Sequence, residues 1–476
     1  MTEEMPRNDS APQRRPQRAK GGPGLARQLG LFDATMIVMG GMIGVAIFVN
    51  PYLVAKQLHT PALILAAWSA GGLIALAGAL VHTELALRIP QVGGVYVYLR
   101  EAYHPSIAFL YGWMLLFVAK SGAMAAVAVA FADLFVHLIR VRFPEGFVAA
   151  LTIVALTTIN CLGVRAGSTV QNIIVVIKIT AIIAIIVCGW SFIVASHASS
   201  RQLLDQPPSF HLATSFASAI VPVLFAFGGW ETLTFMAGEV REPKKNLPRG
   251  LLIGVIGVVM LYLTFNFVCL RALGTQGLAD STTPGMAVML LALGQKGADL
   301  IAVAIGLSML GVLSQVILTA PRIYFAMAED GLLFRGAAWV HPRSRVPVVA
   351  IAVPSIWAIL ITQSAHYEEI LNYVVSAEFL FLGLSAASLF VFRRRDTQRP
   401  DGGVYSRCRV PGHPITTLLF IAACWLVVTT SMVQHPRNGL IQLVILLSGI
   451  PAYIWFRHSS GAARSLDADS KGGTTQ

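Results

Sequence analysis

Two apolar segments of this chain are interrupted by clusters of glycine. One cluster crowds the middle of the run 38–51, and the other interrupts the run 225–231. Glycine costs a helix about 1 kcal/mol relative to alanine, and unwound backbone inside a membrane is tolerated only where protein or a wet cavity satisfies its polar groups. Paired interrupted segments in the two halves of a membrane chain indicate the substrate site of a secondary transporter. The alternative is that the glycines only permit close helix packing.

Ionisable side chains inside apolar segments are the second chemical signal. Lys120, Lys178, Glu231 and Glu378 each lie in such a segment, where a charge costs at least about 2.5 kcal/mol. Lys178 is separated from the expected membrane edge by roughly 15 Å of helix, which makes snorkelling difficult. Glu231 lies two residues after the second glycine cluster and fits either proton sensing or a structural hydrogen bond. Glu378 fits either a pocket wall or a pair with another buried group such as Lys120.

The composition predicts an integral membrane protein. The chain has 476 residues, of which 55% are hydrophobic and 12% are charged, and its mean hydropathy is +0.69. A soluble protein carries about 25% charged residues. The apolar runs reach 20 residues and more, enough to cross a hydrocarbon core of about 30 Å. The five cysteines are scattered, and neither a metal-binding spacing nor a nucleophile–base pattern is present, so we expect no cofactor and no enzyme.

The hydropathy pattern predicts an all-α protein with twelve membrane-spanning helices. The third span is too long for one straight helix across the bilayer, and the segment 273–297 is expected to be a loop outside the membrane. The spans are expected at 32–57, 62–87, 96–139, 147–163, 168–194, 213–238, 249–272, 298–328, 347–365, 369–392, 415–434 and 438–456.

Lysine and arginine fix the predicted orientation. With the N-terminus inside, 26 of the 35 basic residues lie on the inner side and seven on the outer side, the asymmetry that the positive-inside rule describes. We therefore expect a multi-pass protein of the inner (plasma) membrane with both termini cytoplasmic. The formal net charge of +12 then reflects topology and attraction to the lipid bilayer, and no nucleic-acid partner is expected.

The two interrupted segments are the first and sixth predicted spans. Their separation by five spans predicts two five-helix repeats, and the odd number of spans in each repeat makes the second repeat inverted. The polar tails should be disordered. The predicted divisions are a basic cytoplasmic tail at 1–27, a transmembrane domain at 28–457 with repeats at about 32–194 and 213–392 and two extra helices at about 415–456, and a cytoplasmic tail at 458–476.

Five motifs resemble those of the amino acid permeases of the amino acid–polyamine–organocation superfamily, above all its L-type amino acid transporter group. They occur in the family's order and at the matching spans, and the likeness covers about residues 28–456. The motifs are GGMIGVAIFVNP (40–51), PQVGGVYVYLREAY (90–103), FAFGGWETLTFMAGEVREPKKNLPRG (225–250), LTAPRIYFAMAEDGLLF (318–334) and CRVPGHP (408–414).

The resemblance implies a LeuT-like fold in which broken helices hold the backbone of an amino acid. Helix N-termini carry about half a positive charge and free N–H groups that suit a carboxylate, and C-terminal ends offer free carbonyls to an ammonium. Carried over by position, the substrate-binding residues are Met42, Ile43, Gly44, Val45 and Ala46 around the carboxylate, Phe225, Ala226 and Gly228 with carbonyls for the amine, Phe227 as a gate-like aromatic, Trp230 in the side-chain pocket, and Glu231 and Glu378.

The chain departs from the family at Val45-Ala46, where relatives have Ser-Gly. Carboxylate binding should therefore rest on main-chain N–H groups, and a small or atypical substrate is allowed. The resemblance also assigns ion coupling to Lys178 and Glu231. Sodium-independent members of the family place a lysine like Lys178 where sodium-coupled relatives bind an ion, so its ammonium should link the first and eighth spans and can carry a coupling proton.

These features predict a sodium-independent secondary transporter of amino acids that works by alternating access, as an exchanger or linked to protons. A polyamine or amine transporter of the same superfamily is the alternative, because Val45-Ala46 weakens the carboxylate side while Glu231 and Glu378 add negative charge. A sensor that binds an amino acid without moving it is a third reading. The segment 140–146 has no cysteine, whereas animal L-type transporters use one there for a disulfide, so no disulfide-linked glycoprotein partner is expected and a bacterial membrane is favoured.

Overall fold

The computed structural model describes residues 25–139, 143–193, 210–363, 367–398, 409–434 and 436–472. These residues form helices, joined by short turns, and an isolated parallel bridge pairs Leu29 with Val240. The elements are α1 (Leu31–Met42), α2 (Ala46–Gln57), α3 (Pro61–Arg88), α4 (Val95–Ala102), α5 (Pro105–Met114), the π-helix η1 (Leu115–Ala119), α6 (Lys120–Ile139), α7 (Glu145–Leu162), α8 (Val164–Ile193), α9 (Phe210–Ala226), α10 (Thr232–Phe235), the 3-10 helix η2 (Ala237–Glu239), α11 (Pro243–Asp280), α12 (Pro284–Leu293), α13 (Gln295–Thr319), α14 (Pro321–Glu329), the 3-10 helix η3 (Arg335–Ala338), α15 (Val348–Thr362), α16 (Tyr367–Thr397), α17 (Ile415–Gln434) and α18 (Pro436–Gly472).

The described residues contain eight helices that are long and apolar enough to cross a membrane, or nine when the bent pair α1 and α2 counts as one span. Three shorter apolar helices lie at Leu212–Ala226, Pro284–Leu293 and Val348–Thr362. The chain is therefore an all-helical, multi-pass membrane protein, as the composition predicted. The count of twelve spans stays a prediction.

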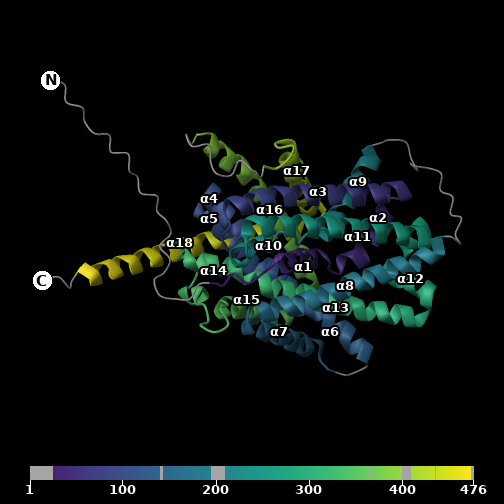
Figure 1. The fold of residues 1–476 in the computed structure, drawn as a ribbon, viewed down its shortest axis with the longest axis horizontal. Coiled ribbons are helices and arrows are strands. Elements are labelled where there is room, and N and C mark those ends of the chain that lie inside the picture. Colours follow the sequence, from purple (N-terminus) through teal and green to yellow (C-terminus); the bar gives the residue numbers. More distant parts are fainter. Residues whose placement is uncertain are drawn as a thin grey trace, which may run out of the picture.

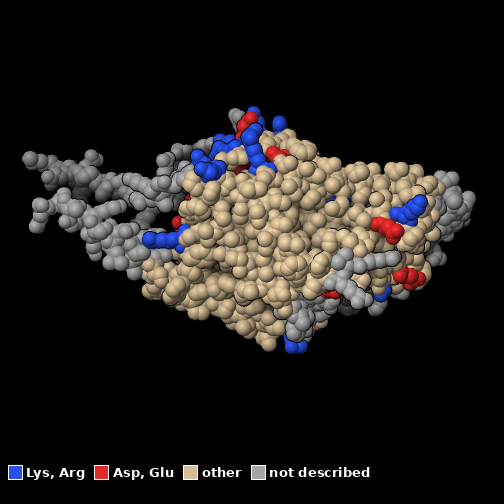
Figure 2. Space-filling view, turned by 90° about the horizontal axis from the view of Figure 1, so that it is seen from below, with Lys and Arg blue, Asp and Glu red and all other residues tan. Residues whose placement is uncertain are grey.

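The helices lie side by side along the long axis of the molecule (Figure 1). α1 packs against α11, α8 and α13 and so occupies the centre of the bundle. α4 and α14 lie toward one end of that axis, and α12 lies at the other (Figure 1). On the face in Figure 2, the charged side chains gather at the margins of a broad uncharged surface. Such a surface suits contact with lipid tails rather than water.

Two predicted boundaries are wrong. The span 96–139 is not one continuous helix, because α4 ends at Ala102 and the long span starts at Pro105. Proline suits the first turn of a helix, where its missing N–H is not needed, and the chain turns there between two helices. The segment 273–297 is largely helical rather than a loop, since α11 continues to Asp280 and α12 follows.

The predicted tails at the two ends of the chain compare differently with the structure. α18 continues as a helix to Gly472, past the predicted end of the transmembrane domain at residue 457. The predicted tail 1–27 lies mostly outside the described residues, which begin at Leu25. The main-chain N–H groups of Gln28 and Leu29 donate to the Glu239 carbonyl at 2.9 and 3.1 Å. The segment before α1 is thus fastened to the segment that follows α10.

Candidate functional site

The first broken helix consists of α1 and α2, which are bent by 42° at the break. α1 ends at Met42, and the Gly44 N–H donates to the Met42 carbonyl at 2.9 Å. Two side chains from other helices also bind this backbone. Lys178 Nζ of α8 donates to the Ile43 carbonyl at 2.7 Å, and the Tyr262 hydroxyl of α11 donates to the Met42 carbonyl at 2.8 Å. Carbonyls that lack partners at a helix end are therefore bound from the side.

α2 begins directly after the break, and its first turn has no side-chain cap. The first N–H groups of a helix have no intrahelical acceptor and carry the positive end of the helix dipole. Val45 and Ala46 are partly exposed, whereas Met42 and Ile43 are buried. The start of α2 can thus bind an anion through main-chain N–H groups without a hydroxyl, which is the chemistry expected from Val45-Ala46.

The second broken helix consists of α9 and α10, which are separated by residues 227–231. Gly229 has φ +98°, a conformation that glycine adopts without the penalty of a Cβ. Its N–H donates to Glu231 Oε2 at 3.0 Å, and the Thr232 hydroxyl donates to its carbonyl at 2.7 Å. The Phe225 carbonyl accepts the Gly228 N–H at 3.1 Å. The break is therefore an ordered turn rather than a loose loop.

The structure brings the two breaks into contact. A Cβ on Gly41 would collide with the carbonyl oxygen of Gly229, and a Cβ on Gly229 would collide with the carbonyl oxygen of Gly41. Gln315 of α13 links the same two segments, because its Nε2 donates to the Ile37 carbonyl at 3.0 Å and to the Thr232 hydroxyl at 3.1 Å. Close approach of two backbones is the reason that glycine occupies both crossing positions.

Phe227 and Trp230 of the second break are packed among other aromatic rings. Phe227 is 1% exposed, and its ring centroid lies 5.8 Å from that of Trp68 and 5.2 Å from that of Tyr262. The Trp230 ring lies 4.9 Å from His82. Phe225 differs, because its side chain is 44% exposed. The Phe227 ring is therefore part of the packed interior, whereas that of Phe225 is not.

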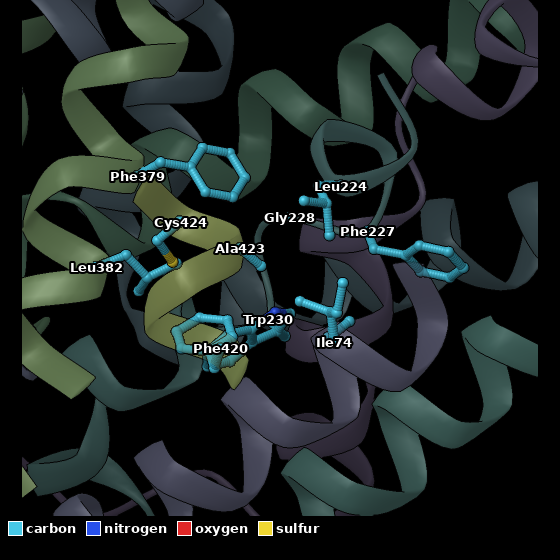
Figure 3. Close-up of a pocket in the computed structure, with 11 residues that line it drawn as sticks. Ile74, Leu224, Phe227, Gly228, Trp230, Phe379, Leu382, Phe420, Ala423 and Cys424 are labelled. Atoms are coloured by element: carbon cyan, nitrogen blue, oxygen red, sulfur yellow. The ribbon is translucent and has the colours of Figure 1, made fainter. Parts of the chain in front are cut away.

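A small apolar cavity adjoins Trp230 (Figure 3). Its walls come from α3, from the end of α9 and from Phe379, Leu382 and Phe420 on α16 and α17. The cavity measures about 20 Å³, which is room for about one water molecule. The cavity is thus too small for an amino acid side chain in this conformation, so such a side chain would enter it only if the walls moved.

Lys178 is buried beneath the first break, with 1% of its surface exposed. α13 passes it at Gly311, where a Cβ would lie 2.6 Å from Lys178 Nζ. Among the residues that the structure describes, no carboxylate lies within 4.0 Å of this ammonium. The charge is instead directed at the Ile43 carbonyl, so it acts on the conformation of the broken helix.

Lys120 and Glu378 form an ion pair between α6 and α16, with 2.5 Å between Nζ and Oε1. Of the two alternatives for Glu378, the structure contains the pairing. Glu231 lies within electrostatic reach of both residues. Lys120 follows the π-helix η1, the kind of helical irregularity that is frequent at functional sites.

A second set of ion pairs lies at the ends of the helices. Arg322 of α14 and Glu239 are both fully buried and meet through two hydrogen bonds of 2.7 and 3.2 Å. The partner of Glu239 is thus Arg322, which is 83 positions away, and not Arg241, which is close to it in the chain. Glu84 near the end of α3 is likewise paired with Arg88 and with Arg393 of α16. The first pair joins α14 to the segment that follows α10, and the second joins α3 to α16.

Sequence reasoning missed three residues that contact the broken helices. Gln315 carried a visible signal, because an amide inside an apolar span needs a partner just as a charge does. Tyr262 and Gly311 carried none, since single tyrosines and glycines are common in membrane helices. Metal chemistry has no candidate in the described ranges, where no group of three or more His, Cys, Asp or Glu residues could hold an ion.

Unwound backbone that is buried in a membrane bundle and lined by polar groups is the architecture of membrane transporters. The chain belongs to the amino acid permease family, whose model matches residues 29–454. The predicted resemblance to the permeases of the amino acid–polyamine–organocation superfamily is confirmed.

Individual relatives match over nearly the whole chain. The serine/threonine exchanger SteT of Bacillus subtilis (strain 168) is 29% identical over 439 residues, which cover 90% of this chain and 97% of that protein. The human large neutral amino acids transporter small subunit 2 is 28% identical, covering 93% and 84%. The human b(0,+)-type amino acid transporter 1 is 28% identical, covering 91% and 88%. These relatives are transporters and exchangers, so the chain is a permease and not an enzyme.

Proposed function

We propose that this permease is a sodium-independent secondary transporter that moves amino acids across the cytoplasmic membrane by alternating access. It works as an exchanger or as a proton-coupled transporter. The proposal includes twelve spans, with two inverted five-helix repeats of the LeuT type and two further helices. It also includes cytoplasmic N- and C-termini, which the distribution of lysine and arginine supports.

The observation that carries this proposal is the contact of Lys178 with the first break. A sodium-coupled transporter needs a cation to bind the free carbonyls of its unwound helix. Here the Lys178 ammonium, itself part of the chain, binds the Ile43 carbonyl at 2.7 Å and lies beside Gly311 of α13. A covalently attached cation makes a bound sodium ion unnecessary at this position, because it supplies the same charge to the same kind of ligand.

The two breaks support a zwitterionic substrate. The N–H groups at the start of α2, near Gly44, Val45 and Ala46, suit its carboxylate, and the carbonyls of Phe225, Ala226 and Gly228 at the end of α9 suit its amine. Met42 and Ile43 would surround the carboxylate, and Trp230 would line the side-chain pocket. Because the cavity beside Trp230 is apolar and close to water-sized, we propose a neutral side chain.

Two coupling features complete the proposal. Glu231 binds the Gly229 N–H at the second break, so a change of its charge would alter the turn that carries the amine-binding carbonyls. We also propose that the chain works without a disulfide-linked glycoprotein, since the segment 140–146 has no cysteine. One relative is named a small subunit, so assembly with a partner is an outcome that size analysis of the purified protein would reveal.

Uptake into proteoliposomes tests the proposed function. Vesicles that contain the protein should take up at least one labelled neutral amino acid equally well in sodium and in choline chloride. Preloading with the same amino acid should accelerate uptake if the protein is an exchanger, and an inward proton gradient should do so if protons are coupled. A strict sodium requirement would refute the proposal. Uptake of polyamines in place of all amino acids would establish the amine transporter instead.

A further inference from the structure

The ion pair of Lys120 and Glu378 borders the wall of the proposed substrate site. Glu378 is followed on α16 by Phe379, and Leu382 lies one helical turn further on the same face. Both of these residues line the cavity beside Trp230 (Figure 3). Glu231, the neighbour of Trp230 in the chain, is within electrostatic reach of Glu378 and Lys120. The pair therefore adjoins the residues of α16 that line this cavity.

The pair is buried but not sealed. The side chain of Lys120 is 10% exposed and that of Glu378 is 22% exposed, so the carboxylate is the more accessible partner. Among the residues that the structure describes, none forms a hydrogen bond with the buried Tyr324 hydroxyl, which also interacts electrostatically with Glu378. This hydroxyl and a partly exposed carboxylate therefore lie in the same region. A polar or charged group of a ligand could bind there.

The carboxylates of this region would favour a cationic ligand if the Lys120 ammonium did not oppose its binding. Of the two carboxylates, Glu231 accepts the Gly229 N–H, whereas Glu378 is paired with the Lys120 ammonium. A guanidinium or ammonium on a substrate side chain would bind a free carboxylate through short, charge-assisted hydrogen bonds. With Lys120 Nζ at 2.5 Å from Glu378, such a substrate would instead meet a like charge in a region of low dielectric constant, where repulsion is strong.

We propose that Lys120 is a specificity-determining residue, which neutralises Glu378 and thereby excludes amino acids that have a cationic side chain. The inference rests on the proposed amino acid transport and adds the basis of its selectivity. Specificity of this kind arises from repulsion of the wrong substrate as much as from attraction of the right one. The pairing also explains why an acid, Glu378, lies beside a site that we propose to bind neutral side chains.

Ligand binding by matched variants tests the inference separately from transport. The variants are Lys120→Met, Lys120→Gln, which keeps a donor for Glu378 but no charge, and Lys120→Met/Glu378→Gln. Lys56→Met removes an exposed lysine of α2 and is the control. Affinity for L-arginine is measured from the shift of the thermal unfolding midpoint with ligand concentration. The best neutral substrate of the wild type is measured in parallel.

Both single variants at Lys120 should bind L-arginine about tenfold more tightly than the wild type, because a charge-assisted contact becomes available. The double variant should lose that gain, and the control should match the wild type. Arginine binding that is unchanged in the folded single variants would refute the inference. So would a wild type that binds L-arginine as tightly as its neutral substrate.

Whether the variants fold also tests the proposed role of Lys120. Failure of both single variants to fold, with a folded double variant, would assign the pair a purely structural role and overturn the inference. A wild type that transports no amino acid would defeat the proposed function, whereas the arginine comparison between the single and double variants would still decide the role of Lys120.

Discussion

Replacing Lys178 by methionine separates the role of this lysine in transport from its role in stability. The change keeps the length of the side chain but removes the ammonium that binds the Ile43 carbonyl at 2.7 Å. A hydrogen bond to a charged group contributes about 1.5–3 kcal/mol, which corresponds to roughly a 10- to 150-fold change in an equilibrium constant. We expect uptake at low substrate concentration to fall by that factor, because the first break loses the group that fixes its backbone.

Stability should respond differently. The buried ammonium of Lys178 has no carboxylate partner in the described part of the chain, so its removal relieves a desolvation cost. This relief offsets the loss of the hydrogen bond to the Ile43 carbonyl, so the thermal unfolding midpoint of Lys178→Met should stay close to that of the wild type. Lys56→Met, on the exposed side of α2, should change neither property.

The assay is initial uptake of a labelled neutral amino acid by proteoliposomes that contain equal amounts of folded protein. Uptake by Lys178→Met within threefold of the wild type would show that the ammonium does not act on transport. A large loss of both uptake and thermal stability would show that the lysine is a structural support, contrary to the reasoning from its missing partner.

Three further predictions concern the breaks and the ion pairs near them. Gly41→Ala should abolish uptake, because its Cβ would collide with the Gly229 carbonyl. Gly44→Ala should be tolerated, since the nearest atom to a Cβ there is at 3.4 Å. Similar uptake by the two variants would contradict the contact between the breaks. Arg322→Met should lower the free energy of unfolding by about 3–5 kcal/mol, because it leaves Glu239 buried and unpaired. Adding Glu239→Gln should recover most of this loss. Denaturant unfolding in detergent measures both variants, and no recovery would mean that the broken ion pair does not cause the loss of stability. Glu231→Gln should flatten the dependence of uptake on pH, because an amide oxygen can still accept the Gly229 N–H but the side chain no longer titrates. An unchanged pH profile would move proton sensing to another residue.

The sequence alone determined the features that have local signals. Glycine clusters within apolar runs predicted both breaks, because a helix that needs glycine at membrane depth shows that need in a few adjacent residues. Lys178, Glu231, Glu378 and Lys120 were also visible, since a charge in an apolar segment is unusual whatever its partner is. The class of the protein followed from composition and from motifs that kept the family's order.

Only the tertiary structure decided which groups meet. Lys120 and Glu378 are 258 positions apart, and nothing in the sequence near either residue specifies the other. The contact of Gly41 with Gly229 and the hydrogen bonds of Gln315 to both breaks likewise depend on how distant helices pack. The boundary between α4 and the following span failed for a different reason, because the turn before Pro105 is marked by a proline and not by a change in local hydropathy. Local patterns report what a residue needs, whereas long-range packing determines which partner satisfies it.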